Sequence, residues 1–357
     1  MEEMVHFGWT EAVTESVEEW IFINYTFSNH STNTNVQTFN TLVYVAPFCM
    51  ITIIANGLVC YAIRKKNLLR LSVYSCIFNM CISDMLSLIA LTINAFVTYA
   101  INVPHLWLYQ ISCKFFNYLL TVSMTVSMLT FAMMAIDRYC IIVGRKKPRL
   151  IFQSKRGIRA IIACIWIYSI ITGIPILHIM SIYKDLITPP RCDISYIGDH
   201  YNRPYFMIYF GVNYFLPMLV TAILHILIVI RLKTAVTIGA GCSRTIPPVF
   251  NVNRKKTINV IKMVAITTCV YIMTTFPYIS IILIITVKRT SLVELRQREL
   301  INSSLITMGF FLSALACVEN PIVCVIMSKM LRKPILEIYH CLLCRKTVQY
   351  RIHVKQK

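Results

Sequence analysis

The sequence has few charged residues for its length. Charged residues make up 14% of its 357 residues, whereas soluble domains hold about 25%, and 57% of the residues are hydrophobic. Apolar runs recur along the chain, and each is long enough to cross a hydrocarbon core of about 30 Å as a helix. This pattern excludes a soluble domain and predicts an all-α membrane protein, a seven-transmembrane helix bundle.

Acidic residues and clusters of reactive side chains are also scarce. The chain holds 15 Asp and Glu against 35 Lys and Arg. The sequence shows no nucleophile paired with a base and no metal-ligand cluster, so neither an enzyme nor a cofactor is expected. A transporter or channel would show internal repeats or charged pathways near the midplane. The sequence has no repeat, and Asp84 is the only acid expected deep in the bundle.

The formal net charge of +20 is distributed as in a membrane protein. Most Lys and Arg residues cluster in alternate loops and in the tail, as the positive-inside rule expects, and residues 1–40 contain none. The distribution places the N-terminus outside and the C-terminus in the cytosol, and it does not indicate a nucleic-acid partner. No cleavable signal peptide is visible, so the first apolar segment is expected to direct insertion.

Three regions are expected along the chain. Residues 1–41 form an extracellular acidic arm, residues 42–327 the bundle, and residues 328–357 a cytoplasmic amphipathic helix with a short basic tail. The arm carries glycosylation sequons at Asn24 and Asn29. Its glutamates have two interpretations that the sequence leaves open: a solvated, glycan-bearing tail, or an acidic attraction for a basic ligand.

The tail combines basic and apolar residues at helical spacing, which predicts a helix lying on the inner leaflet in contact with membrane lipid. Cys341 and Cys344 are placed there for palmitoylation. A metal or redox role for the same pair is a weaker interpretation, because the second ligand pair of a zinc site and a βαβ context are both missing.

The seven predicted helices cover residues 42–63, 73–100, 113–143, 159–182, 205–232, 257–287 and 300–327. Pro217, Pro277 and Pro321 lie within the last three, where a proline kinks a helix and neighbours or water satisfy the freed carbonyls. Asp84 lies in the middle of the second helix, and a carboxylate at that depth needs a partner or an ion.

Cysteines on the outer side predict one disulfide bond. Most of the 14 cysteines lie within apolar segments, where a free thiol behaves as a small hydrophobe. Only Cys113 and Cys192 lie clearly on the outer side, which permits disulfides. We therefore predict that they pair and tie the longest outer loop to the third helix.

The third helix ends in Asp137, Arg138 and Tyr139, directly before a basic loop. An adjacent acid and base at the edge of a bilayer are costly unless they partner each other or meet water. One interpretation is an interfacial charge pair with an arginine that reaches the headgroups. The other is a functional site, and the remaining segments bear on the choice.

Every predicted helix contains at least one landmark that resembles the rhodopsin-like (class A) G-protein-coupled receptors. The landmarks are Asn56, Asn79, Asp84, Cys113, Asp137-Arg138-Tyr139, Trp166, Pro217, Pro277 and Asn320-Pro321. The resemblance covers residues 42–343. It implies a plasma-membrane receptor whose Asp137, Arg138 and Tyr139 meet a heterotrimeric G protein.

Softer features resemble the chemokine-receptor branch and its virus-encoded members. They are the acidic arm, Pro277-Tyr278, Trp107 shortly before Cys113, a basic inner face and a short tail. This resemblance implies a chemokine or another basic peptide as extracellular ligand. In the virus-encoded case it implies the host cell membrane as location.

Several positions depart from the family pattern. The residues concerned are Thr275 for a tryptophan, Tyr271 for a phenylalanine, His225 and Cys324 for two tyrosines, Phe310 for an acid, and Thr257 for another acid. Because Thr257 cannot restrain the arginine, Asp137 is expected to be its only restraint. Two functions stay open: a signalling receptor with ligand-independent activity, or a decoy or heteromer partner that binds ligand without coupling.

The resemblance also implies an internal sodium site. Asp84, Ser127 and Asn320 match the family's sodium ligands. Oxygen atoms around a buried carboxylate suit a hard cation. The alternative is a hydrogen-bonded polar cluster without an ion.

Overall fold

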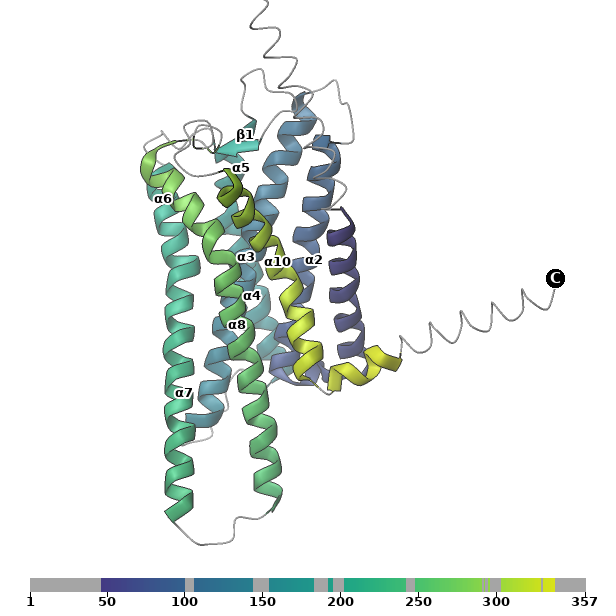
Figure 1. The fold of residues 1–357 in the computed structure, drawn as a ribbon, viewed down its shortest axis with the longest axis vertical. Helices are drawn as coiled ribbons and strands as arrows, with labels where there is room; N and C mark the ends of the chain where they lie inside the picture. Colours follow the sequence, from purple (N-terminus) through teal and green to yellow (C-terminus); the bar gives the residue numbers. More distant parts are fainter. Residues whose placement is uncertain are drawn as a thin grey trace, which may run out of the picture.

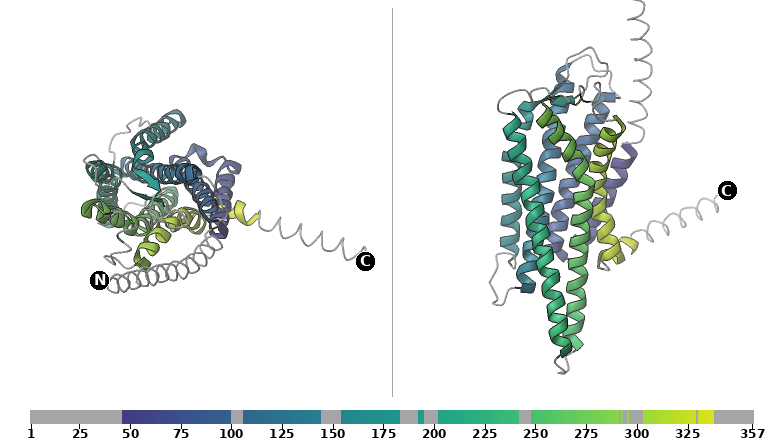
Figure 2. Two further views of the ribbon diagram at one scale, coloured as in Figure 1. Left: turned by 90° about the horizontal axis from the view of Figure 1, so that it is seen from above. Right: turned by 60° about the vertical axis from the view of Figure 1, so that its left-hand side comes forward.

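The chain forms a bundle of long helices that lie side by side (Figures 1 and 2). The structure, a computed structural model, describes residues 46–99, 106–143, 154–182, 192–194, 202–241, 248–290, 292, 295, 303–328 and 330–337. Seven of the described helices are long and apolar enough to cross a membrane. The predicted fold class is confirmed. The acidic arm with Asn24 and Asn29, and the tail cysteines Cys341 and Cys344, lie outside the described residues.

The helices match the predicted spans closely, with differences at their ends. Their bounds are Ala46–Lys65, α2 (Ser72–Tyr99), α3 (Leu106–Val143), α4 (Lys155–Gly173), α6 to α7 (Asn202–Phe210 and Leu216–Gly241), α8 (Pro248–Lys288) and α10 (Ser303–Met327). A short 3-10 turn, η1 (Leu68–Arg70), joins the first helix to α2. The helix α3 begins at Leu106, seven residues before Cys113, where the sequence predicts its start.

The helix α4 ends earlier than predicted. The helix α4 ends at Gly173, Pro175 caps the single turn α5 (Ile176–Ile179), and the chain then enters the strand β1 (Met180–Ile182). Proline has no backbone N–H to donate, so it favours a break followed by a new turn. The last residues predicted as helix are thus strand.

A small antiparallel sheet on the outer side was not predicted. The strand β1 pairs with β2 (Cys192–Ile194), with Ile182 opposite Cys192. Cys192 is bonded to Cys113 near the outer end of α3, and their Cα atoms lie 5.5 Å apart. The predicted disulfide is confirmed. It anchors β2 over the outer end of the bundle.

The helix α3 lies at the centre of the bundle. In an apolar window of 18 residues within its span, 67% of the residues are buried, against 22% in such a window of the span that contains α4. It packs against α2, α4 and α7. Phe131 and Val126 of α3 are fully buried, whereas exposed isoleucines such as Ile167 and Ile171 on α4 form an apolar surface suited to lipid.

Two contacts dock the C-terminal helix of residues 330–337 beneath the bundle, and the prediction of this helix is confirmed. The hydroxyl groups of Tyr74 and Ser328 lie 3.0 Å apart in a buried hydrogen bond. Lys65 and Glu337 form an exposed ion pair at 3.4 Å. Such exposed pairs contribute little, so the buried contact at the start of the helix matters more for its position.

Candidate functional site

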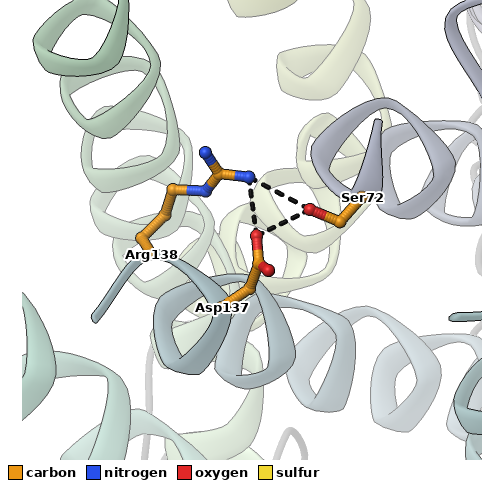
Figure 3. A network of polar contacts seen from close by, with 3 residues as sticks. All are labelled: Ser72, Asp137 and Arg138. Carbon is orange, nitrogen blue, oxygen red and sulfur yellow. Dashed lines mark hydrogen bonds and ion pairs between the residues drawn. The ribbon is translucent and has the colours of Figure 1, made fainter. Parts of the chain in front are cut away.

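Asp137, Arg138 and Ser72 form a closed network at the inner end of α3 (Figure 3). The Arg138 Nη2 atom lies 2.6 Å from Asp137 Oδ2 and 3.0 Å from Ser72 Oγ. The Ser72 hydroxyl in turn donates to Asp137 Oδ2 at 2.6 Å. Each of the three side chains therefore contacts the other two.

Local sequence explains the network. Asp137 and Arg138 are adjacent near the end of α3, and Ser72 is the first residue of α2, directly after the turn η1. The side chains of Asp137 and Arg138 are only 5% and 14% exposed, so their charges are shielded from water and attract each other strongly. The expectation that Asp137 alone restrains the arginine is wrong, because Ser72 also accepts from it.

The arginine retains an unused donor. Its Nε atom is buried and has no hydrogen-bond partner among the described residues. Tyr139, the third residue of the motif, is partly exposed. A guanidinium group with spare donor capacity at the inner end of the bundle is suited to bind carbonyl or carboxylate groups of another protein.

A second polar group lies deeper, between α2 and α10. Asn320 Nδ2 donates to Asp84 Oδ2 at 2.8 Å, and both residues are almost completely buried. Ser127 on α3 is also buried, but its hydroxyl has no partner among the described residues. Two of the three expected sodium ligands are thus in direct contact. Unpaired oxygens on Ser127 and Asn320 fit a hard cation.

The structure buries a second acid that the sequence analysis did not place in the core. Glu319 on α10 is 6% exposed, so the expectation that Asp84 is the only deep acid is wrong. The residue precedes Asn320 directly and lies within the range of the predicted helix. Helical periodicity alone did not reveal which way it faces, because α10 is apolar on almost all sides.

The chain matches a known receptor family over most of its length. The profile described as "7 transmembrane receptor (rhodopsin family)" matches residues 55–323. The chain belongs to this family.

Curated relatives of the receptor include two RYamide receptors. This chain is 27% identical to the RYamide receptor of Tribolium castaneum, over 64% of this chain and 63% of the relative. It is 30% identical to the RYamide receptor of Drosophila melanogaster, over 39% of this chain and 29% of the relative. The matches thus span less than two thirds of either relative. Squid rhodopsin has a similar structure, with a TM-score of 0.69 at 18% identity over 87% of both chains, which supports the fold alone.

The family landmarks occupy connected positions in the receptor. Trp166 donates to Asn79 at 2.8 Å, and Asn79 donates to Thr130 at 3.0 Å, which joins α4, α2 and α3. Asn56 donates to the backbone carbonyl of Cys317 at 3.0 Å and so joins the first helix to α10. These bonds join five helices, three in one set and two in the other.

The predicted prolines also lie within the bundle. Pro277 and Pro321 lie inside α8 and α10, and Pro217 is the second residue of α7, where the chain resumes α-helix after a π-helical turn, η3 (Gly211–Phe215). Such turns insert an extra residue and are frequent at functional sites. Pro217, two residues after the last residue of this turn, is the only proline in α7.

A phenol–hydroxyl bond occupies the region where relatives carry a tryptophan. Tyr214, within the turn η3, lies 2.8 Å from the Thr275 hydroxyl of α8. Thr275 donates to the backbone carbonyl of Tyr271, whose ring packs against Phe131 with centroids 5.0 Å apart. The receptor therefore joins its fifth and sixth spans by a polar contact at this level. Sequence reasoning identified Thr275 but missed Tyr214.

His225 and Cys324 occupy the two positions where the family pattern has a tyrosine. His225 Nδ1 lies 2.8 Å from the Thr221 carbonyl within its own helix, and Cys324 is buried in α10. Neither side chain is hydrogen-bonded to Arg138 among the described residues. A bridge of two phenols to the arginine cannot form from these side chains.

Proposed function

We propose that this receptor binds an extracellular peptide and activates a heterotrimeric G protein at the inner end of α3. The observation that carries the proposal is the network of Arg138, Asp137 and Ser72, which holds a largely buried arginine with an unpaired donor at that end. Release of Arg138 from this network would let its guanidinium group bind a partner from the cytosol.

The inner surface around this network supports an acidic or dipolar partner. Exposed basic side chains lie on the same side of the bundle, on the first helix and the turn after it, on η1, on α4 and on the C-terminal helix. They are Arg64, Lys65, Lys66, Arg70, Lys155, Arg156, Arg159, Arg332 and Lys333. A surface of one sign raises the association rate with an oppositely charged partner, and it also favours the anionic inner leaflet.

The names of two relatives support a peptide as the ligand. Both are RYamide receptors, and the acidic arm of the chain would attract a basic peptide. The relatives found give no support to the chemokine branch or to a viral origin, so the proposal stops at a peptide ligand. The plasma membrane is the location that such a ligand requires.

The sodium ion expected from the family is part of the proposal. Asp84, Ser127 and Asn320 would hold it, and a bound cation would supply positive charge to a carboxylate that lacks a basic partner. Such an ion would stabilise the closed arrangement of α2, α3 and α10, because its ligands come from all three helices.

A binding-only receptor is the second candidate function. It is favoured by His225 and Cys324, which replace the two tyrosines that relatives use in the open state. Loss of those phenols would weaken the state that binds G protein, while leaving the outer side of the bundle able to capture ligand.

Nucleotide exchange on purified G proteins separates the two functions. Wild-type receptor and Arg138→Ala are compared in membranes at matched expression, with and without an RYamide peptide and a panel of basic peptides and chemokines. We expect exchange above that of empty membranes for wild type and none for Arg138→Ala. Exchange equal to empty membranes with every ligand, combined with saturable peptide binding, would establish the binding-only function.

A further inference from the structure

The carboxylate of Asp193 joins the outer sheet to the chain beyond α8. Asp193 is the middle residue of β2, and its Oδ1 atom accepts a hydrogen bond from the backbone N–H of Leu292 at 2.9 Å. The two residues are 99 positions apart in the sequence. The same oxygen accepts from the backbone N–H of Ile194 at 2.7 Å, which fixes the carboxylate in its own strand. Asp193 thus links two segments that are distant along the chain.

This contact is enclosed by the receptor. Asp193 and Ile194 are both buried. On the side of α8, Leu295 is completely buried and Leu292 packs against the core. A carboxylate that loses its water on burial depends on the donors that replace the water. Bonds to a charged acceptor are also stronger than neutral ones, so the bond to Leu292 is a firm connection.

The end of α8 explains how Leu292 reaches the sheet. The helix ends at Lys288, and Arg289 has φ 54°, the left-handed conformation that often follows the last residue of a helix. The N–H of Thr290 then donates to the carbonyl of Ile285 at 3.3 Å, which closes the last turn. Leu292 therefore lies just after the capped end of α8, and its position depends on that of the helix.

The other attachment of the sheet is to α3. Cys192, the neighbour of Asp193, forms the disulfide bond with Cys113, and its Sγ atom also accepts from Asn117 Nδ2 at 3.1 Å. The strand β2 therefore has a covalent bond to α3 and a hydrogen bond to the chain beyond α8. We call β2 with these two attachments the outer strap. The sheet to which it belongs lies at the outer end of the bundle, where Figure 1 labels β1.

We propose that the bond between Asp193 and Leu292 is a reversible lock on peptide entry between α3 and α8. This inference rests on the proposed function as a peptide receptor. The disulfide bond stays closed during ligand binding, whereas a hydrogen bond can break, so the outer strap opens at its attachment to the chain beyond α8. Because Asp193, Ile194 and Leu295 are buried, the receptor's own side chains fill the space at this attachment. The closed strap and a peptide in that space exclude each other.

The lock has a kinetic signature. A peptide that binds only the receptor with an open strap has its apparent affinity reduced by the open fraction. Loss of the bond should raise the open fraction, and with it the association rate and the affinity, by about tenfold, the effect expected of one hydrogen bond to a charged group. The dissociation rate should stay unchanged, because the bond is already broken in the complex.

The test measures association and dissociation of a fluorescently labelled RYamide peptide on the purified, full-length receptor. Asp193→Ala removes the acceptor and Leu292→Pro removes the N–H donor, so each should speed association by about tenfold. The double variant should be no faster than either single variant, because both delete the same bond. Asp193→Asn keeps an acceptor oxygen and should have a smaller effect. Ser112→Ala is the matched control, because its bond to Asn94 joins α3 to α2 and leaves the outer strap unchanged.

Amide hydrogen exchange examines the same bond without any ligand. The Leu292 amide should exchange slowly in wild type and quickly in Asp193→Ala. Saturating peptide should make this amide exchange quickly in wild type as well, because the peptide-bound receptor has an open strap. Should Asp193→Ala fail to fold, Leu292→Pro in the kinetic assay and the wild-type exchange with and without peptide still test the lock.

Three outcomes would overturn the proposal. In the first, association is unchanged in both Asp193→Ala and Leu292→Pro. In the second, Asp193→Ala and Asp193→Asn both slow association, so Asp193 attracts the peptide by its charge. In the third, the Leu292 amide exchanges equally fast in wild type and Asp193→Ala. Should RYamide and the panel of basic peptides all fail to bind wild type, the peptide part of the proposed function fails, and exchange alone decides: slow exchange that Asp193→Ala abolishes supports the lock, and equal exchange overturns it.

Discussion

Removal of the Ser72 hydroxyl should raise the basal activity of the receptor. This hydroxyl accepts from Arg138 Nη2 at 3.0 Å and donates to Asp137 Oδ2 at 2.6 Å, so Ser72→Ala deletes two bonds to charged groups and leaves the ion pair alone. The bonds are present only while Arg138 is held closed. Their loss therefore destabilises the restrained state and leaves the released state unchanged.

The magnitude follows from the kind of bond. A hydrogen bond to a charged group contributes about 1.5–3 kcal/mol, and one such contribution is a conservative estimate for the pair of bonds lost here. Because about 1.4 kcal/mol corresponds to a tenfold change in an equilibrium, the released population should rise about tenfold to a hundredfold. The side chains of Arg138 and Asp137 are only 14% and 5% exposed, so solvent screening reduces this effect little.

The assay is basal nucleotide exchange on G protein without ligand, at matched surface expression. Arg138→Ala sets the floor, and wild type should lie above it, with Ser72→Ala higher still. The control is Ser75→Ala, which lies one turn further along α2 and donates to the Leu69 carbonyl instead of the charge pair. Equal activity of Ser72→Ala and wild type would refute the reasoning, whether both lie at the floor or at the ceiling.

The disulfide, the Tyr214–Thr275 bond and the acidic arm each lead to one further prediction. Cys192→Ala should lower the free energy of unfolding by about 2–4 kcal/mol, the contribution of a typical disulfide, and it should lower delivery to the cell surface. Unchanged delivery would contradict an anchoring role for β2. Tyr214→Phe should cost only about 1 kcal/mol in thermal unfolding, because Thr275 keeps its bond to Tyr271; a loss several times larger would show that the phenol has another function. Neutralising the glutamates of the acidic arm should slow peptide association and flatten its salt dependence, whereas unchanged on-rates would assign the arm to solvation.

Much of the fold followed from local sequence because of the physics of the bilayer. A helix satisfies its own backbone hydrogen bonds in lipid, so each apolar run specifies a spanning helix without reference to the other helices. The same locality explains the disulfide: only Cys113 and Cys192 lie clearly on the outer side, and the structure joins them. The short sheet was missed because its strands are too brief to show a pattern of alternation.

The partners within the core depended on tertiary structure. The sequence identified Asp84, Arg138 and Thr275 as notable positions, but it did not identify Ser72 or Tyr214 as the groups that hold the last two. Each contact depends on how two helices are rotated about their axes and how far they are shifted along each other. In helices that are apolar on most sides, hydrophobic periodicity does not report that rotation.

The sequence by itself therefore determined the number of spans, the expected orientation, the disulfide and the charge pair at the end of α3, because each depends on local composition or on adjacent residues. Only the tertiary structure decided that Glu319 is buried in the core and that Ser72 closes the network around Arg138. The reason is physical: burial is a property of helix packing, and the packing of all the spans fixes which polar atoms are enclosed without a partner.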